Sequence, residues 1–591
     1  MPGHRKTPFS AKQKKKQLQE KRERNRGRFD QVDEEGMPIV GRRSRSHSSQ
    51  KKCPQVADTT VNVKKINQQP GKNKNGHYDP NRYRLHFVKD SDQDIEDRKK
   101  KARIPFKVLP EESLELDVNL IFEPGSALDL PKRPSWNYKM TKEIVERQEE
   151  KYFQEYLDRL FETYKSDNLS FVELNLETWR QLWRVLAMSD IILIITDIRH
   201  PALHFSPALY DHITKDLQKE VILVLNKIDL VQSSLVIAWK RYFQIKFPKL
   251  KIVCFTSYPK DREEIEIDSK RSVFKKRKLK KRGFGVGASK LLQICQEIVQ
   301  DKVDLSSWKR RIEIQIVNEG SDNEEEDAAE IRVEEEIIDT GERFKGGMLT
   351  IGCCGYPNVG KSSLMNGLVG KKVVSVSKTP GHTKHFQTIY LTKTVKLCDC
   401  PGLVFPSLTD KSLQILSGIY PIAQVREPYS SVGFLSERLD LTKILKLKHP
   451  SDDENCNEWS AWDVCDAWAA KKGFLTAKAA RRDVYRAANH ILRLAVEGRI
   501  CLAFRPPNYT ANKSVWENDP EAQSIDQQQE EHSKRNTLSL PEDDEDNSED
   551  AERDYEDGDE DEEDEVENQD GEENLCAMKL TKNPFSVLQD D

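Results

Sequence analysis

Strand-like and helix-like patterns alternate along the middle of the chain. Three apolar runs, each bounded by polar or turn-forming residues, predict buried strands at 190–197, 220–227 and 251–257. Segments with apolar residues at helical spacing precede and separate these runs, at 174–189, 206–219 and 232–246. This rhythm predicts an α/β fold, a mostly parallel sheet with helices on both faces.

The same rhythm returns later in the chain, after an interruption. Strands are predicted at 348–355, 386–392 and 395–402, and helices at 283–299 and 361–370. Two segments are too polar to join a core, a basic insertion at 259–282 and an acidic linker at 306–345. We therefore predict one α/β domain over 171–409, made of a first half at 171–305 and a second half at 346–409.

Both flanks of this domain show helical patterning. Residues 76–170 predict an N-terminal extension, whose helix at 141–164 carries Ile144 and Phe153 among apolar residues at roughly helical spacing. That helix is expected to pack against the segment that follows it. Residues 410–510 predict a small helical C-terminal domain.

Composition limits how much of the chain can fold compactly. With 36% hydrophobic and 33% charged residues, a substantial part of the 591 residues is expected to lie outside any core. The formal net charge of −4 conceals a strong segregation, because Lys and Arg gather at the N-terminal end and Asp and Glu at the C-terminal end. We predict a disordered basic arm at 1–75 and a disordered acidic tail at 511–591.

Three features favour an intracellular protein without a membrane partner. No stretch approaches the roughly 18 consecutive apolar residues of a membrane span, and the N-terminus lacks the apolar core of a secretory signal. The eleven cysteines, odd in number and scattered through apolar segments, are typical of reduced thiols.

A phosphate-binding loop is predicted at 352–363, between a strand and a helix. Gly355, Gly360, Lys361 and Ser362 match the G-x-x-x-x-G-K-[ST] pattern in the context that the pattern requires. The glycines let backbone N–H groups approach phosphates, Lys361 would reach the β/γ oxygens, and Ser362 would bind Mg²⁺. The alternative, a chance match in a surface loop, is disfavoured by the flanking strand and helix.

A second phosphate-side element follows one helix and one strand later. Asp399-x-Pro401-Gly402 ends an apolar strand, where the carboxylate can hold Mg²⁺ through water and Gly402 can give its N–H to the γ-phosphate. By itself this sequence would be a common turn. On the polar loop between the two elements, Thr383 is favoured over Thr379 as a threonine that closes on Mg²⁺, because it lies nearer the following strand.

A base-reading element comes before the phosphate loop in the chain. Asn226-Lys227-x-Asp229 follows a buried strand, and an aspartate in this setting can accept the two donors on the edge of guanine, which adenine does not offer. A simple turn is the alternative. One strand later, Thr256 and Ser257 would supply a second base-side loop, which makes an accidental match much less probable.

The order base, phosphate, switch resembles that of the circularly permuted GTPases of the YlqF/YawG type. The resemblance covers roughly 133–510 and includes RPSW at 133–136, DIRHP at 197–201 in place of Asp-Ala-Arg-x-Pro, and a helical ending similar to that of nucleostemin and the large-subunit GTPases. It implies a permuted P-loop GTPase domain. Permutation is physically possible because strand positions in a sheet depend on pairing and not on chain order.

The resemblance also implies roles for individual residues. It adds Val359 and Ser363 to the nucleotide-binding loop, assigns Lys361, Thr383 and Gly402 to catalysis, and makes Asn358 a candidate ligand for K⁺. Leu403 stands where many GTPases carry a water-positioning glutamine, so slow hydrolysis is expected. A departure is Tyr258, which follows Thr-Ser where the family usually has a small residue.

These observations predict a GTP-binding protein with slow hydrolysis, acting as a switch in ribosome biogenesis or another ribonucleoprotein assembly step. The basic arm and the cluster at 275–282 would contact RNA, pre-ribosomal particles or import receptors, which implies a nuclear or nucleolar location. A solvated role for these charges is the alternative. A nucleotide-binding scaffold or signalling protein with little hydrolysis, and an ATP-using enzyme, are the rival functions; Asp229 disfavours ATP.

Overall fold

The computed structural model describes most of the chain between residues 85 and 528. The terminal arm and tail, the basic insertion, Thr383 and Tyr258 lie outside the described residues. The described residues are 85, 87–88 and 91–528, apart from 124, 127, 138, 165–168, 258–284, 318–330, 333–342, 371–372, 375, 377–379, 381–386, 451–457 and 477–480.

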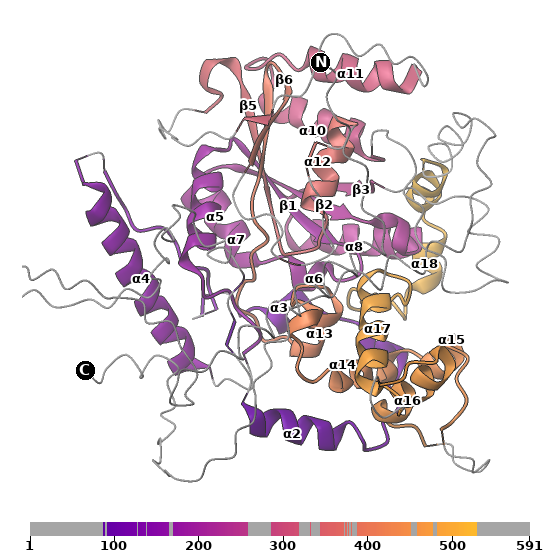
Figure 1. Ribbon diagram of the computed structural model, residues 1–591. Helices are drawn as coiled ribbons and strands as arrows, with labels where there is room; N and C mark the ends of the chain where they lie inside the picture. The colour runs from indigo at the N-terminus through magenta and orange to yellow at the C-terminus, as the bar shows by residue number, and fades with distance from the viewer. Residues whose placement is uncertain are drawn as a thin grey trace, which may run out of the picture. The chain divides into compact units, whose positions relative to one another are not determined.

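One sheet joins the two halves of the α/β domain (Figure 1). Its order in the described chain is β3-β2-β1-β5-β7-β6-β4, and β1 pairs with β5 in parallel, with Ile191 opposite Ile351. Among the strand pairs of the described residues, only β7–β6 and β6–β4 are antiparallel. The strands are β1 (Ile191–Asp197), β2 (Glu220–Asn226), β3 (Lys251–Phe255), β4 (Ile331–Arg332), β5 (Leu349–Cys354), β6 (Gln387–Thr392) and β7 (Val395–Asp399).

The pairing of β1 with β5 confirms the predicted mostly parallel α/β domain. β1 is buried along its whole length, as expected for a strand in the middle of a sheet that is covered on both faces. The pair brings residues more than 150 positions apart into one sheet. The two halves of the domain therefore form one continuous sheet, although they are far apart in the chain.

Helices pack on this sheet close to where the hydrophobic periodicity predicts them. The helix predicted at 206–219 is shorter and irregular in the structure. It begins as α7 at Pro207 and continues into a π-helical turn, η2, which ends at Asp216. Gln218, shortly after it, has a φ of 51°, which is not helical. The helices are α5 (Leu176–Met188), α6 (Pro201–His204), α7 (Pro207–Asp211), η2 (His212–Asp216), η3 (Ile228–Leu230), α8 (Ser233–Lys246), α10 (Ala288–Val299), α11 (Ser306–Val317), η4 (Lys345–Gly347) and α12 (Lys361–Val369).

The acidic linker begins later than the sequence indicates. Residues 306–317 form α11, and the buried side chains of Trp308 and Ile312 hold it on the domain. The prediction missed this helix because it was based on the average charge of 306–345, to which two buried apolar residues contribute little. Arg311 adds hydrogen bonds to the carbonyls of Leu391 and Val369, at 2.6 and 3.2 Å.

The N-terminal extension packs against α5 through its long helix. Phe153 on α4 is buried, and its ring lies 6.4 Å from that of Trp179. Ile144, which the pattern placed on the packed face, is 52% exposed because it lies in the first turn of the helix, ahead of the buried stripe. The helices of the extension are α2 (Asp92–Lys101), η1 (Glu111–Leu114), α3 (Val118–Ile121) and α4 (Lys142–Thr163).

A helical region follows β7, and the N-terminal extension contacts it. The N–H of Phe106 donates to the carbonyl of Trp459 at 3.0 Å, and that of Leu116 to the carbonyl of Arg505 at 2.9 Å. Figure 1 shows α2 beside α14 in this region. The helices are α13 (Lys411–Leu416), η5 (Ile422–Gln424), α14 (Tyr429–Arg438), α15 (Leu441–Ile444), α16 (Ala461–Lys472), α17 (Val484–Val496) and α18 (Lys513–Glu517).

In the part of the chain that the structure describes, no helix combines the length and the apolar character needed to cross a membrane.

Candidate nucleotide site

Polar loops gather where parallel strands end at one edge of the sheet. Asp197, Asn226 and Asp399 are the last residues of β1, β2 and β7, and Gly355 follows β5 directly. Since these strands are parallel, their carboxyl ends meet at the same edge. In open α/β sheets this edge is where ligands bind.

The phosphate loop follows β5 and requires glycine at two positions. Gly355 has a φ of 150°, and a side chain there would come within 2.5 Å of the carbonyl oxygen of Ile195. Gly360 has a φ of 97°, and a side chain there would come within 2.4 Å of Nδ2 of Asn226. The amino terminus of α12 begins directly after this turn, an arrangement that favours a bound anion.

Lys361 begins α12 with its side chain folded back over the loop. Its Nζ donates to the carbonyls of Tyr356 and Gly355, at 2.6 and 3.1 Å, and the side chain is buried. Burial lowers the pKa of this amine, while the nearby carboxylate of Asp399 acts in the opposite direction. The loop therefore encloses a cation at the amino terminus of a helix, which is suited to phosphate oxygens.

Ser362 and Asp399 come together from the helix and from the neighbouring strand. The hydroxyl of Ser362 donates to Oδ2 of Asp399 at 2.9 Å. Within the described chain, Oδ1 of Asp399 is buried without a hydrogen-bond partner. Burial raises the pKa of Asp399 to about 6, although Lys361 and Ser362 oppose the shift. A buried carboxylate oxygen beside a hydroxyl fits Mg²⁺, which prefers oxygen ligands.

Gly402 lies close to the phosphate loop. A side chain there would approach Cα of Pro357 within 2.7 Å and Nζ of Lys361 within 3.1 Å. The next residue, Leu403, is buried, and its N–H donates to the carbonyl of Gly355 at 3.3 Å. The main chain after β7 is therefore held against the loop that Lys361 occupies.

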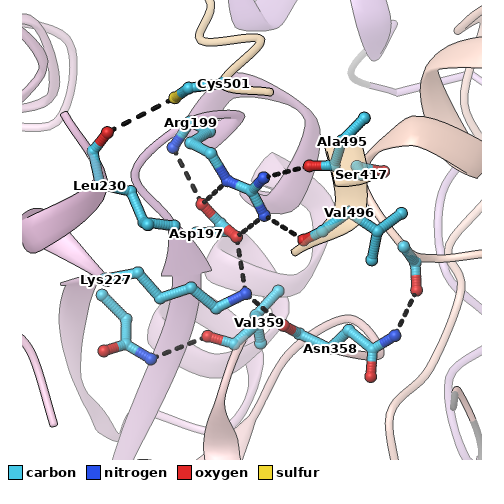
Figure 2. Close-up of polar contacts among 12 residues, drawn as sticks. Asp197, Arg199, Lys227, Leu230, Asn358, Val359, Ser417, Ala495, Val496 and Cys501 are labelled. Atoms are coloured by element: carbon cyan, nitrogen blue, oxygen red, sulfur yellow. Dashed lines mark hydrogen bonds and ion pairs between the residues drawn. The ribbon is translucent and has the colours of Figure 1, made fainter. Parts of the chain in front are cut away.

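The loop after β2 contacts the phosphate loop directly (Figure 2). Nδ2 of Asn226 donates to the carbonyl of Val359 at 2.8 Å, and Nζ of Lys227 donates to the carbonyl of Asn358 at 2.6 Å. Lys227 has a φ of 62°, a left-handed conformation that turns the chain sharply after the strand. Two sequence motifs whose contacting residues lie 131 and 133 positions apart thus form one structure.

The second base-side loop meets both neighbours. The hydroxyl of Thr256, which is buried, donates to Oδ1 of Asp229 at 2.6 Å. The hydroxyl of Ser257 donates to the carbonyl of Ser363 in α12 at 3.0 Å. Asp229 is therefore supported from the loop after β3, and that loop is tied to the helix of the phosphate loop.

The sequence motifs do not predict two sets of hydrogen bonds that join the site to the helical region. Nδ2 of Asn358 donates to the carbonyl of Gly418, in the loop after α13, at 2.9 Å. The guanidinium of Arg199 donates to the carbonyls of Ala495 and Val496, in the last turn of α17, at 2.9 and 3.2 Å. Only the resemblance of residues 197–201 to a family motif signals the second link.

The fold and the site define a class of protein. A phosphate loop after β5, an aspartate at the end of β7 and an Asn-Lys-x-Asp loop after β2, with the base-side strands first in the chain, make a circularly permuted P-loop GTPase fold. A family model described as "50S ribosome-binding GTPase" matches residues 350–432.

The chain belongs to the family of guanine nucleotide-binding protein-like 1. It is 49% identical to that protein from Homo sapiens over 541 residues, 88% of each chain. It is 33% identical over 396 residues to "Large subunit GTPase 1" of Saccharomyces cerevisiae, covering 64% of this chain and 58% of the other. The crystal structure of GNP-bound YlqF from T. maritima aligns with 56% of this chain and 98% of that one, with a TM-score of 0.32 and 16% identity.

Proposed function

We propose that this protein is a GTP-dependent switch with slow hydrolysis that acts in ribosome biogenesis or another ribonucleoprotein assembly step. The observation that carries the proposal is the direct joining of the base-side loop, the phosphate loop and the helical region, through Lys227, Asn358 and Gly418. A ligand that contacts the two loops is placed to affect how the helical region docks.

Each element of the site has a place in this proposal. Asp229, oriented by Thr256, pairs with the N1 and N2 donors of guanine. Lys361 and backbone N–H groups within 355–363, where Pro357 has none, hold the phosphates. Ser362 and Asp399 would hold Mg²⁺. Thr383, proposed as a further ligand, lies outside the described residues. When bound, Mg²⁺ neutralises phosphate charge. Gly402 gives its N–H to the γ-phosphate.

Slow hydrolysis follows from the residue after Gly402. Leu403 is buried and apolar, so it orients no water molecule. A K⁺ ion held by Asn358 would supply charge that the side chains do not. This proposal for Asn358 requires its amide oxygen to face the ion while its Nδ2 remains on the carbonyl of Gly418.

Similar proteins and charged segments support the ribonucleoprotein role. The matching family model is described as "50S ribosome-binding GTPase", and the yeast relative is named "Large subunit GTPase 1". Basic segments at 1–50 and 275–282 carry charges that RNA phosphates and import receptors recognise, which supports a nuclear or nucleolar location. Binding of RNA through them should weaken steeply with salt. The acidic stretch at 541–574 competes for the same cations.

Sedimentation tests the proposal. Tagged full-length protein, loaded with a non-hydrolysable GTP analogue or with GDP, is run on a density gradient with and without ribonuclease. The proposal expects co-sedimentation with large particles that depends on the nucleotide and disappears after ribonuclease. Protein that stays in the light fractions in all four arms would refute the ribonucleoprotein role.

A nucleotide-binding scaffold is the second candidate, and the buried Leu403 is the observation that favours it. The two functions differ in phosphate release. Single-turnover release of phosphate that is abolished by Lys361→Ala supports a slow GTPase. Bound GTP recovered intact after many hours, with particle binding unchanged between GTP and GDP, supports a scaffold.

A further inference from the structure

Arg199 is buried between the base-side loop and the helical region, and no step of nucleotide binding uses it. Its side chain is 1% exposed. Nη2 forms an ion pair with Oδ2 of Asp197 at 2.8 Å, and Nε donates to Oδ1 of the same carboxylate at 3.1 Å. Because both carboxylate oxygens are engaged, the plane of the guanidinium is fixed relative to the end of β1.

Another edge of the same guanidinium reaches the end of α17. Nη1 donates to the carbonyl of Ala495 and Nη2 to that of Val496. The last carbonyls of a helix lack partners within the helix and carry partial negative charge, so a cation there is stabilising. The main chain of Arg199 adds a third contact, because its carbonyl accepts from the N–H of Phe504 at 2.8 Å.

Asp197 joins this contact to the nucleotide loops (Figure 2). Its Oδ2 also accepts from Nζ of Lys227 at 2.7 Å, and that same Nζ donates to the carbonyl of Asn358. Burial alone would raise the pKa of Asp197, but Arg199 and Lys227 together lower it well below its ordinary value. The three charges depend on one another, since removing one leaves another buried without compensation.

A second set of contacts joins the segment after α17 to the loop after β2. Gly498, two residues after the end of α17, has a φ of 81°, and a side chain there would come within 3.1 Å of two carbon atoms of Leu230. Sγ of Cys501 donates to the carbonyl of Leu230 at 3.4 Å. Leu230 directly follows Asp229, so the segment after α17 lies against the turn that carries the base-reading carboxylate.

We propose that Arg199 is a positioning residue that couples guanine-nucleotide binding to the docking of the carboxyl end of α17. Through Asp197 it holds Lys227 against the phosphate loop, and through Ala495 and Val496 it holds the helix. Nucleotide affinity and helix docking then share one set of contacts, and each must strengthen the other to the same extent. The inference rests on the proposed binding of guanine nucleotides at this site.

Hydrogen exchange at saturating GDP tests the coupling. In the wild-type protein, GDP should slow amide exchange across 484–504. Arg199→Lys keeps the charge but cannot pair with both carboxylate oxygens and also reach two carbonyls. We expect this variant to bind GDP at least about fivefold more weakly. Once saturated, it should show little added protection of 484–504 while protection of the phosphate loop remains.

A matched pair of glycine variants probes the same contact from the helix side. Gly498 and Gly473 both follow helices of the helical region with positive φ, 81° and 68°, but a side chain at Gly473 would meet no atom within 4 Å. Gly498→Ala and Gly473→Ala therefore introduce similar backbone strain. Only Gly498→Ala should weaken GDP binding, because only it pushes against Leu230.

The outcomes separate this inference from the proposed function. Wild-type protein that binds no guanine nucleotide would refute the function itself. GDP binding without added protection of 484–504, or full protection retained in saturated Arg199→Lys, would overturn the coupling alone. Equal loss of affinity in the two glycine variants would also overturn it, since strain and not the contact with Leu230 would then be the cause.

Discussion

The hydroxyl of Thr256 donates a hydrogen bond to Oδ1 of Asp229 at 2.6 Å, joining the residue that follows β3 to the turn η3 that follows β2. Both side chains are buried, so the bond forms in a medium where it is strong and directional. It fixes the rotation of the carboxylate before any ligand arrives. A carboxylate held in this way loses little side-chain entropy when it binds a ligand.

Asp229→Asn should change the preferred base from guanine to xanthine. The substituted amide can still accept from Thr256, but it presents N–H donors where guanine also presents donors, whereas xanthine has a carbonyl there. Displacement of a bound fluorescent nucleotide by GTP or XTP measures the relative affinities. The affinity ratio of GTP to XTP should fall at least tenfold, or roughly 1.4 kcal/mol, because a donor of the amide then faces a donor of guanine. Thr256→Val is the control, expected to weaken both nucleotides without reversing their order.

Lys361→Ala and Ser362→Asn should weaken binding in distinguishable ways. Without Lys361, phosphate charge at the loop is uncompensated, so affinity should fall with Mg²⁺ and also in its absence. Ser362→Asn removes a hydroxyl paired with Asp399, so its loss should appear mainly when Mg²⁺ is present. Isothermal titration with GTP in Mg²⁺ and in chelator separates the two. Unchanged affinity in both variants would exclude 355–362 as the phosphate loop.

Hydrolysis should be faster in K⁺ than in Na⁺, and Asn358→Ala should abolish the difference. The same substitution also removes the hydrogen bond to the carbonyl of Gly418, so a control is required. Gly418→Ala places a side chain within 3.3 Å of Nδ2 of Asn358 and strains a φ of 77°, but it keeps the amide. It should retain the K⁺ effect. Identical rates of phosphate release in the two salts would argue against an ion at Asn358.

His490 should make the helical region less stable in acid. Burial and the neighbouring Lys472 and Arg499 lower its pKa in the folded chain to about 4, from 6.5. As the pH falls, the unfolded chain therefore takes up the proton before the folded chain does. The stability that neutral His490 contributes is complete above pH 6.5 and is lost as the pH falls to about 4. Urea unfolding measures the free energy of unfolding at each pH in this range. Its slope against pH should be smaller in His490→Gln, by the equivalent of up to one bound proton. Glutamine is chosen because it can still accept a hydrogen bond from Nε1 of Trp468. An identical slope in the variant would contradict the assignment.

Among the described residues, the hydrophobic pattern was sufficient for β1, β2, β3, β5, β6 and β7 and for most helices of the α/β domain. It missed β4, which pairs with β6 from within the stretch predicted as an acidic linker. Buried runs such as 191–197 and amphipathic segments such as 176–188 form where they were expected, because local burial repeats with the period of each element. The pattern was insufficient where two residues did the anchoring. Trp308 and Ile312 hold α11 in a stretch whose average charge indicated a linker.

The sequence by itself determined which chemical groups the site contains, because Lys361, Ser362, Asp399 and Asp229 stand in motifs whose spacing follows from strand and helix lengths. Tertiary structure alone decided that Asn226 and Lys227 would donate to carbonyls of the phosphate loop, and that Arg199 would reach α17. These contacts join segments 130 to 300 positions apart and end on backbone carbonyls. Every residue has such a carbonyl, so no pattern of side chains marks the ones that will be used.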